Sequence, residues 1–123
     1  MKFTQEDLEK LLRKWQKKLR LDNWDIQVKV VRASEMTLPN VQGENDYSPA
    51  LHKSVVKILD PIDYETDLSE EQDMERTLVH ELMHLVLWHC TPKESKNLKR
   101  QLFETSVEQL ANALVDMKRG QKK

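Results

Sequence analysis

The most constraining stretch of the sequence is an apolar segment, residues 78–88, that carries two histidines and a glutamate. It reads Leu78-Val79-His80-Glu81-Leu82-Met83-His84-Leu85-Val86-Leu87-Trp88. The apolar residues recur at helical spacing and predict a helix seated in a core. His80 and His84, four residues apart, would then lie one turn apart on the same face. Buried imidazoles need partners, so this helix is expected to hold something between its histidines.

The spacing of the two histidines matches the His-Glu-x-x-His pattern of zinc sites. His80 and His84 can hold one ion together, and a catalytic zinc usually has three protein ligands and one open position. Glu81 is placed to take a proton from a water at that position and to return it to a leaving group. A chance pairing on a solvated helix face is the alternative, but the chain has only four histidines and this helix is apolar. We therefore predict one catalytic Zn²⁺ with Glu81 as the base.

The third ligand has four candidates: His89, Cys90, Glu104 and Glu108. His89 lies five residues past His84, where an exposed imidazole at a helix end is the ordinary interpretation. Cys90, a lone cysteine after an apolar stretch, is more often a small buried hydrophobe than a ligand. Glu104 and Glu108 lie one helical turn apart and point the same way, so periodicity alone does not separate them.

The first half of the chain predicts a helix followed by strands. Apolar residues at spacings of three and four predict a helix over 4–21, with Thr4 and Asp7 near a capping arrangement. Alternation over 24–30 predicts a strand. Residues 34–49 look like a loop with a short extra strand near Val41, and residues 51–59 predict a second strand that Asp60-Pro61 ends. The two main strands are expected to share one sheet.

The second half predicts two helices. The histidine helix follows an acidic connection, with Ser69 as its candidate cap, and ends before Pro92. A last helix runs from about Glu94 to Lys118, with five apolar residues along one face: Leu98, Leu102, Leu110, Leu114 and Met117. The pattern as a whole predicts an α+β fold in a single domain, residues 1–123.

Composition excludes several classes of partner. The 20 basic and 21 acidic residues leave a net charge of -1, which argues against binding to nucleic acid or anionic lipid. The basic tail, residues 118–123, is the one feature that would suit a DNA-associated factor. The sequence has no long apolar run for a membrane span, no apolar leader after Met1 and one cysteine, so a cytoplasmic protein is expected.

Four segments together resemble a known family. They are Asn23-Trp24-Asp25-Ile26, Ile58-Leu59-Asp60-Pro61, the histidine motif, and Glu108-Gln109-Leu110-Ala111-Asn112. The set is similar to the minimal gluzincins, which are small cytoplasmic, archaeal and phage-encoded relatives of the SprT-like and ImmA/IrrE-type zincins. The resemblance implies a zincin-like fold with an N-terminal helix, a small twisted sheet, an active-site helix and a C-terminal glutamate helix.

The resemblance also implies roles for individual residues. Glu108 takes the place of the third ligand, Ala111 lets the two helices approach, and Asn112 supports a histidine ligand from behind. The edge strand beside the cleft would be residues 52–59, which could pair with an extended substrate peptide. Tyr47 and Tyr64 are candidate donors to the developing oxyanion, although packing or surface roles are more ordinary for tyrosines.

Two functions follow as expectations. The first is a zinc metallopeptidase, an endopeptidase of the gluzincin type acting on a protein or peptide, with His80, His84 and Glu108 as ligands. The second is a zinc-binding regulatory or protein-interaction domain that keeps the fold and turns over little or no substrate. Glu81 favours the first, because a purely structural zinc site needs no base and is usually closed by four protein ligands.

Overall fold

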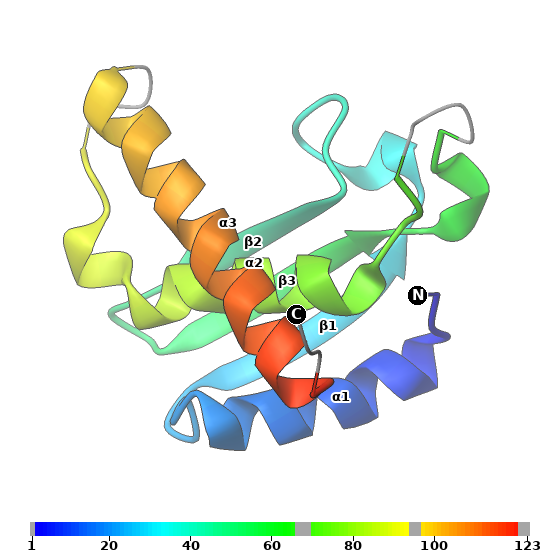
Figure 1. The fold of residues 1–123 in the computed structure, drawn as a ribbon, viewed down its shortest axis with the longest axis horizontal. Coiled ribbons are helices and arrows are strands. Elements are labelled where there is room, and N and C mark those ends of the chain that lie inside the picture. Colours follow the sequence, from blue (N-terminus) through cyan, green and yellow to red (C-terminus); the bar gives the residue numbers. More distant parts are fainter. Residues whose placement is uncertain (1, 66–69, 94–96, 121–123) are drawn as a thin grey trace.

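The computed structural model describes residues 2–65, 70–93 and 97–120 and is an α+β structure (Figure 1). Three α-helices and three strands alternate with short 3₁₀ turns. In chain order the main elements are α1 (Gln5–Lys18), β1 (Asp25–Val31), β2 (Gly43–Ser48), β3 (Lys53–Leu59), α2 (Met74–Val86) and α3 (Leu98–Lys118). None of the helices in these ranges is long and apolar enough to cross a bilayer.

The sheet has the order β1-β3-β2, with β3 in the centre. β1 runs parallel to β3, and β2 runs antiparallel to it. The prediction that residues 52–59 form the edge strand beside the cleft is therefore wrong. The hairpin from β2 into β3 covers that edge, and β2 was hard to see in the sequence because Gly-Glu-Asn-Asp-Tyr-Ser lacks the β-branched residues typical of strands.

The helices cover one face of this sheet. Ile26 and Val28 of β1 and Val56 and Ile58 of β3 point into the core, while their neighbours in sequence are more exposed. α1 lies beside β1, and α2 lies beside β2 and β3. The predicted cap of α1 is confirmed, because Thr4 and Asp7 form a reciprocal capping box.

α2 is the central helix of the core. Leu78, Val79 and Leu82 are fully buried along it, as the apolar segment predicts. Asp73 caps its N-terminus by accepting a hydrogen bond from the Arg76 backbone N–H. The predicted cap, Ser69, lies outside the described residues.

α3 packs on α2 through a face different from the one that its leucines suggest. Its buried residues are Val107, Ala111 and Val115, spaced four apart. The leucine face is largely exposed, with Leu98, Leu102, Leu110 and Met117 all in solvent. Small and β-branched residues let the two helices approach closely, so they form the contact that the larger side chains of the other face would not allow. The predicted start near Glu94 lies outside the described residues.

Candidate metal centre

The two histidines of α2 face a glutamate of α3. The His80 and His84 rings are 5.4 Å apart between centroids. Glu104 Oε1 lies 3.8 Å from His80 Nε2 and 3.5 Å from His84 Nε2. One ligand atom from each of the three residues therefore falls within 4.8 Å of the others, so this group could hold a metal ion.

Glu108 lies one turn further along α3 and contacts the other side of the first histidine. Its Oε1 is 2.8 Å from His80 Nδ1, and its side chain is 59% exposed. This contact orients the His80 ring so that Nε2 faces Glu104 and His84. A carboxylate on the far nitrogen of a histidine is the usual partner of a metal-binding imidazole.

The other predicted ligands lie elsewhere. His89 and Cys90 belong to a 3₁₀ turn after α2, and neither joins the group that His80, His84 and Glu104 form within the described residues. His89 stacks on Trp88 with 4.0 Å between ring centroids. Cys90 is exposed, contrary to the expectation of a buried hydrophobe, because it follows the end of α2.

Asn112 does not support a histidine, which corrects the role inferred for it from the resemblance. Its side-chain and main-chain oxygens both accept hydrogen bonds of 3.2 Å from Arg76 Nη1. Arg76 lies one turn before His80, and its long side chain reaches across to α3 at this level. The carboxylate in contact with His80 Nδ1 is that of Glu108, one turn earlier in α3.

Glu81 is buried beside the histidines. Its side chain is 8% exposed, and burial raises its pKa to about 7. The neighbouring His80 opposes the shift, while the negative charges of Glu104, Glu44 and Glu108 add to it. A carboxyl group with a pKa near neutrality is suited to taking up and returning a proton.

Strand β2 holds Glu81 in place from the sheet side. Asn45 Nδ2 donates a 2.9 Å hydrogen bond to the Glu81 backbone carbonyl, and Asn45 Oδ1 accepts one of 2.7 Å from Ser54. Gly43 allows close approach, because a Cβ there would lie 2.6 Å from Thr77 Cγ2 and 3.3 Å from Glu81 Oε2. Sequence reasoning missed both residues, since nothing in a loop-like segment marks its contact with a distant helix.

A third missed residue is Arg100, one turn before Glu104. Its Nε lies 3.2 Å from Glu104 Oε2, on the oxygen that faces away from the histidines. The spacing of four residues could have suggested this pair. Arg100 also acts on His84, whose pKa is lowered mainly by burial and further by the positive charges of His80 and Arg100, against the charge of Glu104. A lowered pKa favours the neutral imidazole that binds metal.

Two cavities of about 350 Å³ and 750 Å³ open on either side of this cluster, and His80, Glu81 and Gly43 line both. Tyr64 lines the smaller cavity and donates its hydroxyl to the Glu70 carbonyl at 2.7 Å. Tyr47 lines the larger one and packs edge-on against Trp24. The cluster therefore lies between two open cavities that share part of their lining, and the two cavities together are called the path.

Comparison with known proteins adds no relative. No protein-family model matches the chain, and comparisons with curated proteins and with solved structures found no match. The geometry of the cluster is therefore the guide to function.

Proposed function

We propose that the protein is a zinc-dependent metallopeptidase of the gluzincin type with a zincin-like fold. The observation that carries the proposal is the convergence of His80 Nε2, His84 Nε2 and Glu104 Oε1 beside the buried carboxyl group of Glu81. Two imidazoles and one carboxylate form the three-ligand set typical of catalytic zinc, which leaves a position open. The same set can take cobalt or manganese, so zinc is chosen on ligand type and availability.

Glu104 is the proposed third ligand, and Glu108 is proposed to hold His80. Glu104 Oε1 faces the Nε2 atoms of both histidines, whereas Glu108 contacts Nδ1 of one. Glu108 as the ligand, which the resemblance implies, is the alternative. The two carboxylates lie on the same face of α3. Both side chains would have to rotate to exchange their roles.

The proposed reaction is hydrolysis of a peptide bond. When bound, zinc supplies a Lewis acid that polarises the scissile carbonyl oxygen. The Glu81 carboxylate takes a proton from the water that attacks the carbonyl carbon. It then returns this proton to the nitrogen of the leaving amine as the C–N bond breaks. Burial of Glu81 supports this cycle, because the raised pKa brings proton uptake and release within reach near neutral pH.

The proposed substrate is an extended segment of polypeptide. β2 is the edge strand next to the cluster, and its outer side is not paired with another strand of the described sheet. An edge of this kind can pair with an added strand, whose main-chain hydrogen bonds would hold it across both cavities. The path is open at both sides of the cluster, which suits an endopeptidase.

The test is cleavage of an unfolded protein by the zinc-loaded chain, read by mass spectrometry of the products. We expect cleavage that a chelator stops and added zinc restores. Glu81→Gln should reduce the rate by about 10²- to 10⁴-fold while keeping the metal, since it removes only the proton acceptor. Cleavage that is unchanged in Glu81→Gln would contradict the mechanism. Full metal loading with no cleavage would favour the regulatory zinc-binding domain instead.

A further inference from the structure

The path past the cluster is far more acidic than the chain as a whole. The chain has 20 basic and 21 acidic residues. Five carboxylates line the smaller cavity and four line the larger, with Glu81 common to both, so eight line the path. Among the described residues, Arg76 and Arg100 are the two Lys or Arg residues that line it.

Most of the carboxylates that lack a close cationic partner lie at the two ends of the path. Asp73 is paired with Arg119 and Arg76, and Arg76 is paired in addition with Asp116. At the smaller cavity this leaves Glu70 and Glu71, both exposed, with no ion pair to a described residue.

The larger cavity is lined by a further pair of carboxylates, Asp46 and Glu44. Asp46 is 66% exposed, and its nearest cation is Lys57 Nζ at 4.0 Å. Glu44 is buried and accepts hydrogen bonds from Thr37 Oγ1 and the Leu38 backbone N–H, which carry no charge. Acidic residues therefore lie on both sides of the cluster.

A second observation favours a ligand site between these carboxylates. Glu81 is more than nine-tenths buried, lines both cavities, and accepts no hydrogen bond through its carboxylate from any described residue. A buried carboxyl group without a protein partner is costly unless something that enters the path contacts it. The acidic residues thus flank a place where a ligand is expected, rather than an arbitrary surface.

We propose that this path selects polypeptide segments rich in lysine and arginine, with cationic side chains on both sides of the cluster. The inference rests on the proposed function for the identity of the ligand as a peptide. Even with a divalent cation bound and Glu81 replaced by glutamine, the seven other carboxylates outnumber the positive charges along the path. A cleft lined by one sign of charge concentrates ligands of the opposite sign, and long Lys and Arg side chains reach its walls from an extended backbone.

The experiment measures binding, so that it does not depend on turnover. The zinc-loaded Glu81→Gln chain is titrated into a fluorescein-labelled, unstructured peptide of about twelve residues with four lysines. A matched peptide has glutamines in their place. By fluorescence anisotropy we expect the lysine peptide to bind about 10-fold more tightly at 50 mM NaCl, and about 2-fold more tightly at 500 mM, because salt screens exposed charges.

A pair of double variants locates the effect. Glu70→Gln/Glu71→Gln should reduce the preference for lysine about threefold at 50 mM NaCl, since two charges of the smaller cavity are lost. Glu6→Gln/Glu9→Gln makes the same change in net charge on exposed residues of α1, which lies beside β1 at the opposite edge of the sheet. This control should leave the preference unchanged.

Equal binding of the two peptides at low salt, or equal effects of the two double variants, would overturn the inference. These outcomes are separate from a failure of the proposed function. Cleavage of both peptides by the zinc-loaded wild-type chain at equal rates would keep the peptidase and reject the charge preference. A lysine preference without cleavage of either peptide would keep the charge preference and reject the peptidase.

Discussion

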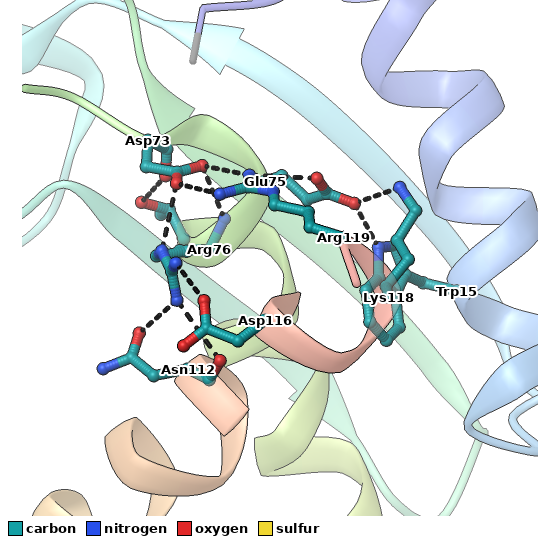
Figure 2. A network of polar contacts seen from close by, with 9 residues as sticks. Trp15, Asp73, Glu75, Arg76, Asn112, Asp116, Lys118 and Arg119 are labelled. Carbon is teal, nitrogen blue, oxygen red and sulfur yellow. Dashed lines mark hydrogen bonds and ion pairs between the residues drawn. The ribbon is translucent and has the colours of Figure 1, made fainter. Parts of the chain in front are cut away.

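The two ends of the contact between α2 and α3 use the same kinds of residue in opposite ways. Figure 2 shows one end, where the start of α2 meets the end of α3. Three carboxylates, Asp73, Glu75 and Asp116, are there matched by three cations, Arg76, Lys118 and Arg119. At the other end, Arg100 is the one described Lys or Arg residue that pairs with any of the carboxylates of Glu81, Glu104 and Glu108. The remaining contacts of Glu104 and Glu108 are with His80 and His84.

At the matched end, each carboxylate has a cationic partner within the protein. Glu75 is 2% exposed and accepts hydrogen bonds from Trp15 Nε1 at 2.8 Å and Arg119 Nη2 at 3.1 Å, besides an ion pair with Lys118 (Figure 2). Nothing further is needed to satisfy it. The other end is left with excess negative charge next to two histidines, which is the condition that a divalent cation would relieve. Charge balance therefore distinguishes a structural network from a candidate site on the same pair of helices.

The largest expected difference between the two ends is the loss of stability when one carboxylate is removed from each. Glu75→Ala should lower the free energy of unfolding of the metal-free protein by about 2–4 kcal/mol, because it leaves Arg119 and Lys118 without their buried partner. Glu108→Ala, at the exposed side of the other end, should cost less than about 1 kcal/mol. Urea unfolding followed by circular dichroism measures both. Similar losses for the two variants would remove the distinction between the ends.

The two ends should also respond to pH with opposite signs. Burial raises the pKa of Glu75, but hydrogen bonds from Lys118, Trp15 and Arg119 outweigh it, so its pKa is lowered. Its contribution to stability is present above the unfolded value of about 4.3 and is lost as the pH falls through the folded value. The pKa of Glu81 is raised to about 7, so the metal-free protein should lose stability as the pH rises from about 4.3 to about 7.

The Glu81 effect can be isolated by one variant. Glu81→Gln should remove a pH-dependent loss of up to about 4 kcal/mol, since one pKa unit corresponds to about 1.4 kcal/mol. The difference in unfolding free energy between the two metal-free proteins, measured from pH 4 to pH 8, removes most contributions of groups that they share, such as His84. A difference that stays constant over this range would contradict the assigned pKa.

The close approach of β2 to α2 gives a smaller prediction. Gly43→Ala should cost about 1–2 kcal/mol, because the new Cβ would meet Thr77 Cγ2 at 2.6 Å. Thr77→Ser removes that methyl group, so the alanine should cost much less in the Thr77→Ser background. A double-mutant cycle by urea unfolding measures the coupling. Equal costs in both backgrounds would show that Thr77 is not the obstacle.

Local patterns in the sequence predicted much of this fold. The Thr4 capping box, the alternating strands β1 and β3, and the apolar α2 each carry a signal within a few neighbouring residues. For the edge strand the sequence predicted only a short strand near Val41, whereas β2 runs from Gly43 to Ser48. The local signal is weak because this polar sequence becomes a strand only by pairing with β3. The leucines of α3 predicted the wrong packing face for a similar reason. Which face of α3 packs is decided by the partner helix α2.

The residues of the candidate site also fall into those that local spacing predicts and those that depend on how the helices pack. His80, Glu81 and His84 follow from spacing within one helix. Glu104 and Glu108 share a face, so their roles depend on how far α3 is shifted along α2, which no local pattern records. Arg76 illustrates this point: its contact with Asn112 fixes which turn of α3 lies at the level of the histidines.

The most direct test of the central claim is metal content by mass spectrometry, with affinity measured by chelator competition, for wild type, Glu104→Gln and Glu108→Gln. We expect about one zinc per wild-type chain and loss of zinc in Glu104→Gln. Glu108→Gln should keep zinc with an affinity about 10- to 100-fold weaker, as expected for a residue that supports a ligand. Loss of zinc in Glu108→Gln with retention in Glu104→Gln would exchange the two roles. A wild-type chain that binds no metal when zinc is supplied would contradict the account.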